Sequence, residues 1–114
     1  MKTIIAGSRD INDFFLVDKA IKESNFLITE VVSGTARGVD NDGEHWGHVN
    51  KIPVKRFPAE WTIHGKSDGY KRNVDMAEYA DAAIIIWDGK SKGSKHMIDI
   101  AKEKKLKVFI KIVD

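Results

Sequence analysis

Three short segments of the chain combine glycine with hydroxyl or basic side chains. They span residues 7–9, 33–38 and 88–94. Glycine lets backbone amides approach an anion closely, and the first amides of a helix have no partner within the helix and lie at the positive end of its dipole. Phosphate is the natural ligand of such segments. The candidate ligand contacts are Gly7, Ser8, Arg9, Ser33, Gly34, Thr35, Arg37, Gly89, Ser91, Gly93 and Ser94, together with Asp40.

Each of these segments, taken alone, is also explained by an ordinary tight turn, because glycine is needed wherever the backbone takes a positive φ. The two standard phosphate-binding fingerprints are absent. The sequence contains no G-x-G-x-x-G, and residues 89–91 lack the upstream glycine of a P-loop because position 84 is Ile84. The prediction of a phosphate site therefore depends on the three segments meeting at one place.

Short apolar runs alternate with longer segments of helical periodicity along the chain. The runs are too short and too β-branched to be helices, and they predict strands at residues 2–6, 30–33, 52–57, 82–87 and 106–113. The fourth run is apolar throughout, which is typical of a central parallel strand covered on both faces. Helices are predicted at residues 12–24, 38–50, 70–79 and 94–105. Asn12 or Asp13 is the expected cap of the first helix, and Gly43 and Gly47 weaken the prediction of the second.

This alternation predicts an α/β fold, with residues 1–114 forming a single Rossmann-like three-layer domain around a five-stranded parallel sheet. Right-handed crossovers favour the strand order 3-2-1-4-5. The direction of winding then reverses between strands 1 and 4, so we expect the ligand crevice over their carboxyl ends. The three glycine segments follow strands 1, 2 and 4, and parallel pairing brings all of them to this edge.

The composition is that of an ordinary soluble globular protein, with 42% hydrophobic and 32% charged residues among 114. The chain contains no cysteine, which excludes disulfides, thiolate zinc sites and cysteine nucleophiles. The apolar run at residues 3–6 is too short for a secretory core or a membrane span. We therefore expect a cytoplasmic protein that does not associate with membranes.

The formal net charge is only +2, but the charge is unevenly distributed along the chain. Residues 90–114 contain eight lysines against Asp99, Glu103 and Asp114. One interpretation is a solvated helix face followed by an edge strand protected by lysine. The other is attraction of a polyanion, and a net charge this close to neutral makes nucleic acid an unlikely partner.

Five blocks of sequence resemble the SLOG superfamily and, within it, its small YspA-like members. The resemblance spans nearly the whole chain. The blocks are AGSRD (6–10), SGTARGVD (33–40), GKSDGYKRNVDM (65–76), ADAAIIIWDGKSKGSKHMI (80–98) and the closing strand. The superfamily also contains the Lonely guy phosphoribohydrolases and the DNA-processing protein DprA. The resemblance implies a Rossmann-like fold that binds a nucleotide or a nucleotide-derived ligand.

Arg72, followed by Asn73, resembles the ligand-binding and catalytic arginine of the Lonely guy enzymes. A guanidinium at a helix start can hold phosphate through two hydrogen bonds, although pairing with Asp68 or Asp75 on its own helix is the alternative. In those enzymes a glutamate after the fourth strand assists cleavage of the ribosyl bond, whereas the corresponding positions here are His96 and Met97.

Two other carboxylates are candidates for the catalytic role that the missing glutamate leaves open. They are Asp88 and Asp40. N-glycosidic hydrolysis needs a group that activates water or stabilises an oxocarbenium-like centre, and a carboxylate usually serves. However, Asp88 could instead cap the following turn, and Asp40 could be an acid of a helix N-terminus. If the protein is an enzyme, the catalytic candidates are therefore Arg72 and Asp88.

Histidine and tryptophan give weaker signals. His45 and His48 are three residues apart, but no third ligand is apparent, so we expect surface histidines rather than a metal site. We expect Trp46 and Trp87 to pack in the core. Trp61, in the long segment 58–68 with His64 and Gly65, is the better candidate for stacking on a base.

Three functions remain open on the sequence alone. We favour a sensor or binding module for a nucleotide-derived phosphate ligand, without a cofactor. The alternatives are a nucleoside monophosphate phosphoribohydrolase or related N-glycosidase, and a binder of single-stranded nucleic acid that uses the C-terminal lysines. We also expect a homodimer, since Lonely guy proteins pair through helices and Tyr70, Met76 and Tyr79 could form an apolar helix face.

Overall fold

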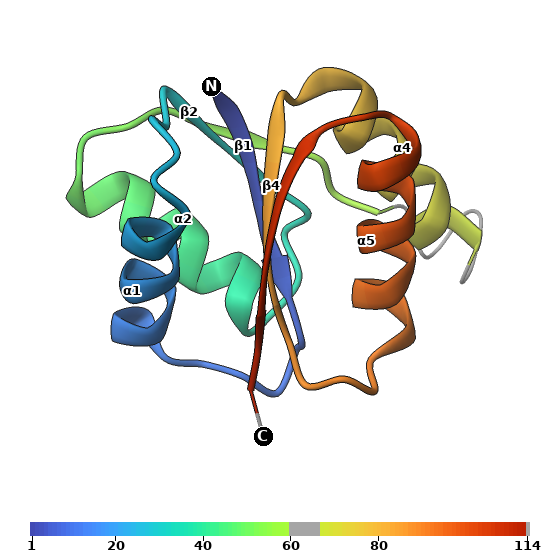
Figure 1. Cartoon of the computed structure of the whole chain (residues 1–114), viewed down its shortest axis with the longest axis horizontal. Coiled ribbons are helices and arrows are strands. Elements are labelled where there is room, and N and C mark those ends of the chain that lie inside the picture. Colours follow the sequence, from blue (N-terminus) through green and yellow to red (C-terminus); the bar gives the residue numbers. More distant parts are fainter. Residues whose placement is uncertain (60–66, 114) are drawn as a thin grey trace.

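A computed structural model of the chain describes residues 1–59 and 67–113 (Figure 1). Trp61, His64 and Gly65, which the sequence analysis singled out, lie outside the described residues. Strands and helices alternate in the predicted order. The elements are β1 (Lys2–Gly7), α1 (Phe14–Ser24), β2 (Glu30–Ser33), α2 (Val39–Val49), β3 (Val54–Arg56), α4 (Ser67–Tyr79), β4 (Ala82–Trp87), α5 (Lys92–Glu103) and β5 (Lys107–Ile112).

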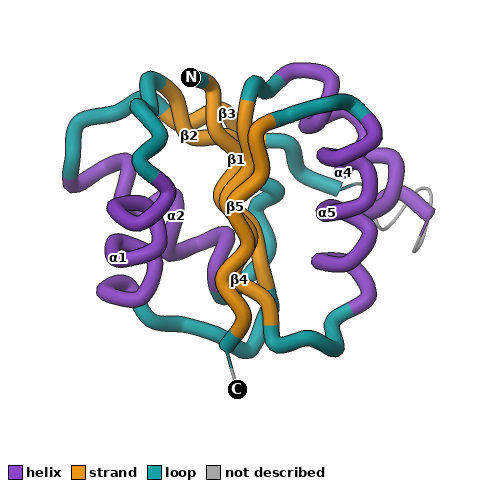
Figure 2. The backbone as a smooth tube through the Cα atoms, viewed as in Figure 1, coloured by secondary structure: helices purple, strands orange, loops and turns teal. Residues whose placement is uncertain are grey.

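The five strands form one parallel sheet in the order β3-β2-β1-β4-β5, which confirms the predicted fold class and topology. In the central pair, Ile5 of β1 is opposite Ile84 of β4 and Gly7 is opposite Ile86. Figure 2 shows the sheet between two helical layers, with α1 and α2 on one face and α4 and α5 on the other. The fold therefore places the three loops that follow β1, β2 and β4 at one edge.

Alternate side chains of each strand pack on opposite faces of the sheet. Ile4 and Ile85 join a core cluster with Met76 and Met97 from α4 and α5. Ile5 and Ile84 join the cluster under α1 and α2. Because β4 contributes to both clusters, residues 82–86 are all buried, as the uniformly apolar sequence predicts.

Helix α2 contains two glycines because it packs closely on the sheet. A Cβ atom on Gly43 would lie 2.7 Å from Cγ2 of Ile5, and one on Gly47 would lie 3.0 Å from Cγ2 of Val54. Trp46, between them, is only 7% exposed, as expected of a core residue, and its Nε1 donates to Asp18. The close approach of helix and sheet compensates for the low helical propensity of glycine.

The element boundaries differ from the sequence-based prediction by up to three residues. Helix α1 begins after Asp13, whose side chain accepts a hydrogen bond from the Leu16 amide. Strand β3 begins at Val54 rather than at residue 52, because Pro53 has no N–H to donate to the ladder. Helix α4 begins at Ser67 rather than at residue 70, although Gly69 lowers the local preference for helix. None of the helices in the described part of the chain is long and apolar enough to cross a membrane.

Candidate functional site

Three neighbouring cavities open at the carboxyl edge of the sheet, and all three are lined by both Arg9 and Arg72. We call them together the groove. The aromatic-sided cavity, of about 580 Å³, is lined by Arg9, Gly69, Tyr70, Arg72, Asn73, Ser91 and Gly93. The arginine cavity, of about 270 Å³, is lined by Arg9, Gly34, Thr35, Ala36, Arg37, Ala59 and Arg72. A small floor cavity of about 60 Å³ shares lining residues with both, and its lining also includes Gly7, Asp40, Ser94, Met76 and Met97.

Eleven of the predicted ligand contacts line the groove. They come from the end of β1, from the loops after β1, β2 and β4, from the first turn of α2 and of α5, and from α4. The eleven are Gly7, Arg9, Gly34, Thr35, Arg37, Asp40, Arg72, Asn73, Ser91, Gly93 and Ser94. Three other candidates, Ser8, Ser33 and Gly89, do not line these cavities.

Ser8 and Ser33 brace the loops from within. Both side chains are buried. The Ser8 Oγ accepts a hydrogen bond from the Asp88 amide at 3.1 Å, which ties the β1 loop to the β4 loop. The Ser33 Oγ donates to Oε2 of Glu44 at 2.6 Å and accepts from the Thr35 amide at 3.0 Å. These hydroxyls shape the groove without lining it.

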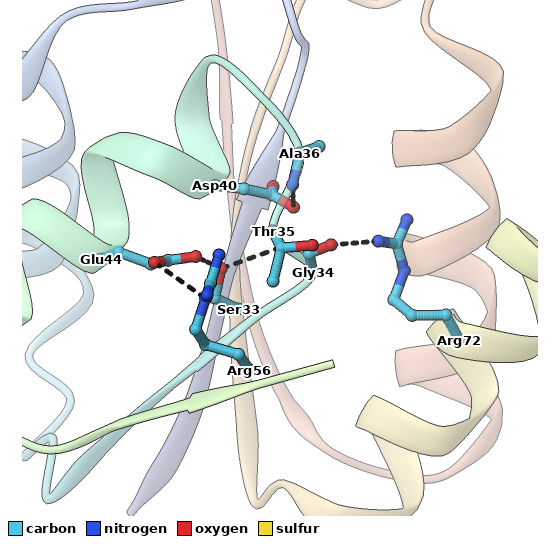
Figure 3. Close-up of polar contacts among 8 residues, drawn as sticks. All are labelled: Ser33, Gly34, Thr35, Ala36, Asp40, Glu44, Arg56 and Arg72. Atoms are coloured by element: carbon cyan, nitrogen blue, oxygen red, sulfur yellow. Dashed lines mark hydrogen bonds and ion pairs between the residues drawn. The ribbon is translucent and has the colours of Figure 1, made fainter. Parts of the chain in front are cut away.

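Glu44 and Arg56 extend this bracing to the edge of the sheet. The Arg56 Nε lies 3.3 Å from Oε1 of Glu44, whose other oxygen accepts from Ser33 (Figure 3). Glu44 follows the block at 33–40 that resembles the SLOG superfamily, but Arg56 carried no signal in the sequence. Its position at the end of β3, beside Ser33 in the parallel register, could be inferred only from strand pairing.

Arg72 reaches from α4 across the groove to the loop after β2. Its Nη1 donates to the carbonyl oxygen of Gly34 (Figure 3). Its Nε donates to Oδ1 of Asn73 at 3.1 Å. A planar guanidinium held by two hydrogen bonds is fixed in orientation, which favours recognition of phosphate. Arg72 therefore has a defined place at the centre of the groove.

Asp40 lies beneath the same loop and is only 4% exposed. Its Oδ2 accepts a hydrogen bond from the backbone amide of Ala36 at 3.3 Å, and the carboxylate lies near the amide of Gly7. Burial raises the pKa of Asp40 to about 6, although the nearby charge of Arg72 and the two amides act in the opposite direction. Asp40 thus joins the β1 and β2 loops and supplies a negative charge behind Arg72.

Asn73 joins α4 to α5 at the wall of the groove. Its Nδ2 lies 3.4 Å from the Gly93 carbonyl oxygen and 3.1 Å from Nδ1 of His96. Burial lowers the pKa of His96, which favours the neutral imidazole. The Tyr70 ring meets His96 edge-on at 4.6 Å between centroids. Sequence reasoning missed Tyr70 as a groove residue, although it lies one helical turn before Asn73.

Asp88 caps the loop after β4. Its Oδ1 accepts hydrogen bonds from the amides of Lys90 and Ser91, each at 2.8 Å. These hydrogen bonds lower the pKa of Asp88. Gly89 takes a positive φ of 80° within this turn. Of the two interpretations that the sequence left open, the capping of a turn is the one that these contacts describe.

The paired histidines lie away from the groove on α2. His45 and His48 are both exposed. Across residues 1–59 and 67–113, no group of three histidine, cysteine or acidic side chains is arranged to hold a metal ion.

This architecture is that of a small Rossmann-like domain with a polar groove at the switch between β1 and β4. The YspA, cpYpsA-related SLOG family matches residues 1–64, more than half of the chain, and the chain belongs to this family. Arg72 and the loop after β4 lie beyond the matched residues. The Gene 61 protein of Mycobacterium phage D29 is 30% identical over 105 residues, which cover 83% of each protein.

A solved structure shares the fold. DNA processing protein A (DprA) from Streptococcus pneumoniae matches with a TM-score of 0.75 and 18% sequence identity over 96% of this chain. The chain spans about half of that protein, 49% of its length. At this level of identity the likeness shows a shared Rossmann-like architecture, and membership of a SLOG family supports a nucleotide-related function in general.

Proposed function

We propose that the chain binds a nucleotide or a nucleotide-derived phosphate ligand in the groove, as a sensor or binding module. The observation that carries this proposal is the meeting of Arg9 and Arg72 in three adjoining cavities at the carboxyl edge of the sheet. Ligands of open α/β sheets bind at this edge, where the winding reverses. Guanidinium groups and backbone amides together are the usual partners of phosphate.

Gly93 gives independent support. It is the second residue of α5, it has no positive φ, and a Cβ atom there would meet no described atom within 4 Å. Glycine in a helix is destabilising by roughly 0.5–1 kcal/mol relative to alanine. Neither steric crowding nor backbone conformation in the described structure accounts for it. Close approach of a ligand to the Gly93 amide does account for it, because this residue lines the groove.

The contacts of the two candidate catalytic carboxylates favour a ligand-binding function over hydrolysis. Asp88 uses Oδ1 to hold two amides of its own loop, and Asp40 is buried against the amides of Ala36 and Gly7. A general base must reach a water beside the scissile bond. Incubation with purine nucleoside monophosphates checks this directly, and we expect no release of free base.

The ion pairs of the C-terminal lysines favour the interpretation of this segment as a solvated surface. Lys95 pairs with Asp99, Lys104 with Glu78 and Lys111 with Glu23. These ion pairs reduce the net attraction of the segment for a polyanion. We therefore expect weak binding of single-stranded oligonucleotides compared with small nucleotides, measured by calorimetry at several salt concentrations.

Pairing of two chains through α4 stays a prediction, and one part of its basis was wrong. Met76 is only 1% exposed and packs in the core, so it cannot contribute to an outer apolar face. The Tyr79 hydroxyl donates to Glu30. Of the three side chains expected to form the face, Tyr70 is the one that is exposed. Light scattering across a wide concentration range measures the mass in solution.

The experiment that tests the proposed function is mass spectrometry of small molecules that copurify with the native protein. We expect a compound that contains a nucleotide. The same measurement on the Arg72→Ala variant serves as the control, because loss of the guanidinium should remove most of the bound compound. Absence of any nucleotide from the native protein, together with no binding of added nucleotides, would refute the proposal.

A further inference from the structure

The two larger cavities of the groove differ in the character of their linings. The aromatic-sided cavity exposes mainly apolar surface and has Tyr70 in its wall, whereas the arginine cavity exposes mainly polar surface. The aromatic-sided cavity is also about twice as large, about 580 Å³ against about 270 Å³. Its size and apolar wall suit a nucleoside, while the smaller polar cavity suits an anionic group.

The arginine cavity has a strongly cationic lining. Three of its lining residues, Arg9, Arg37 and Arg72, are arginines. Among the described contacts, Nη2 of Arg37 lies 3.5 Å from Oδ1 of Asp10, and the buried Asp40 lies near Arg72. The Asp10 and Arg37 side chains are 88% and 76% exposed, so this ion pair contributes little and can open for a ligand.

Arg37 and the start of α5 line different parts of the groove. Arg37 lines the arginine cavity and neither of the other two, whereas Ser91 and Gly93 line the aromatic-sided and floor cavities. Arg9 and Arg72 line all three cavities and lie between these ends. An anion near Gly93 and an anion near Arg37 would therefore both contact the central pair of arginines.

We propose that the arginine cavity is a second anion subsite, and that the ligand is a nucleoside diphosphate or an ester of one. One phosphoryl group lies at the start of α5 and the next lies among Arg9, Arg37 and Arg72. This inference rests on the proposed function, because it assumes that the groove binds a nucleotide. It adds the number of phosphoryl groups and assigns a specificity-determining role to Arg37.

The test compares nucleoside monophosphates with the matching diphosphates for adenosine, guanosine, cytidine and uridine, by calorimetric titration without magnesium. For the base that binds, we expect the diphosphate to bind about tenfold more tightly than the monophosphate. Arg37→Ala should weaken binding of the diphosphate by about tenfold and change binding of the monophosphate by less than about twofold. Lys102→Ala, at the far end of α5, removes the same charge and should change neither by more than about twofold.

The possible outcomes separate this inference from the proposed function. Equal affinities for monophosphate and diphosphate, or an equal loss of both in Arg37→Ala, would overturn the second subsite while leaving nucleotide binding intact. Failure of every nucleotide to bind the parent protein would overturn both. Because Arg37 is an exposed loop residue, its variant should fold, and circular dichroism with a thermal transition matching the parent's verifies this.

Discussion

Arg72 and Asp40 meet at a single glycine. A Cβ atom placed on Gly34 would lie 2.7 Å from Nη1 of Arg72 and 2.7 Å from Oδ2 of Asp40. These two side chains come from α4 and α2, which pack on opposite faces of the sheet. Because Gly34 has no side chain, a cation and a buried carboxylate can both lie against this one residue.

Replacing Gly34 by alanine should destabilise the protein, because the new methyl group would force Arg72 or Asp40 out of place. We expect a loss of about 1–3 kcal/mol in the free energy of unfolding, typical of overpacking. Urea unfolding followed by circular dichroism measures it. An unchanged unfolding midpoint would contradict the close approach of the two side chains.

Gly93→Ala makes the same chemical change where the described structure has open space, so it is the matched control for Gly34→Ala and a prediction of its own. Its free energy of unfolding should stay the same or rise by up to about 1 kcal/mol, because alanine is the better helix former. Ligand affinity should fall, because the methyl group occupies the approach to the amide. Retained affinity would remove Gly93 from the site.

Asp40 should make stability depend on pH. Its folded pKa of about 6 lies above the ordinary value of 3.8, so the folded protein binds more protons than the unfolded chain between these values. Stability should therefore fall as the pH rises from about 4 to 6, by at most ~3 kcal/mol from this group. The contribution of Asp40 is isolated by measuring, across this pH range, the difference in unfolding free energy between the parent and Asp40→Asn. A difference that does not vary with pH would show that the Asp40 pKa is not raised.

Arg72 should contribute more to ligand affinity than any lysine of the C-terminal segment. Arg72→Ala should weaken binding of the copurified ligand by about 2 kcal/mol or more, because a positioned guanidinium makes charge-assisted hydrogen bonds. Lys104→Ala should cost about 0.5 kcal/mol or less, since Lys104 is a surface residue paired with Glu78. Calorimetric titration compares them. Equal affinities for Arg72→Ala and the parent would move the search to Arg9 and Arg37.

The sequence alone determined the order of the elements and hence the topology. Apolar runs of β-branched residues mark the strands, and right-handed parallel connections leave few ways to arrange them. The same reasoning placed the loops after β1, β2 and β4 at one edge, because glycine and polar residues follow each of these strands. Local signals were sufficient here because strand spacing and connection handedness are general properties of the polypeptide chain.

Only the tertiary structure decided which of the candidate side chains enter the groove. Ser8 and Ser33 turn inward to brace loops, while Arg9 and Arg37 line the cavities. Arg72 finds its partner 38 residues away, at the carbonyl of Gly34. The direction of a loop side chain depends on the backbone dihedral angles and on partners contributed by distant elements. These partners come into place only when the sheet and both helical layers have assembled.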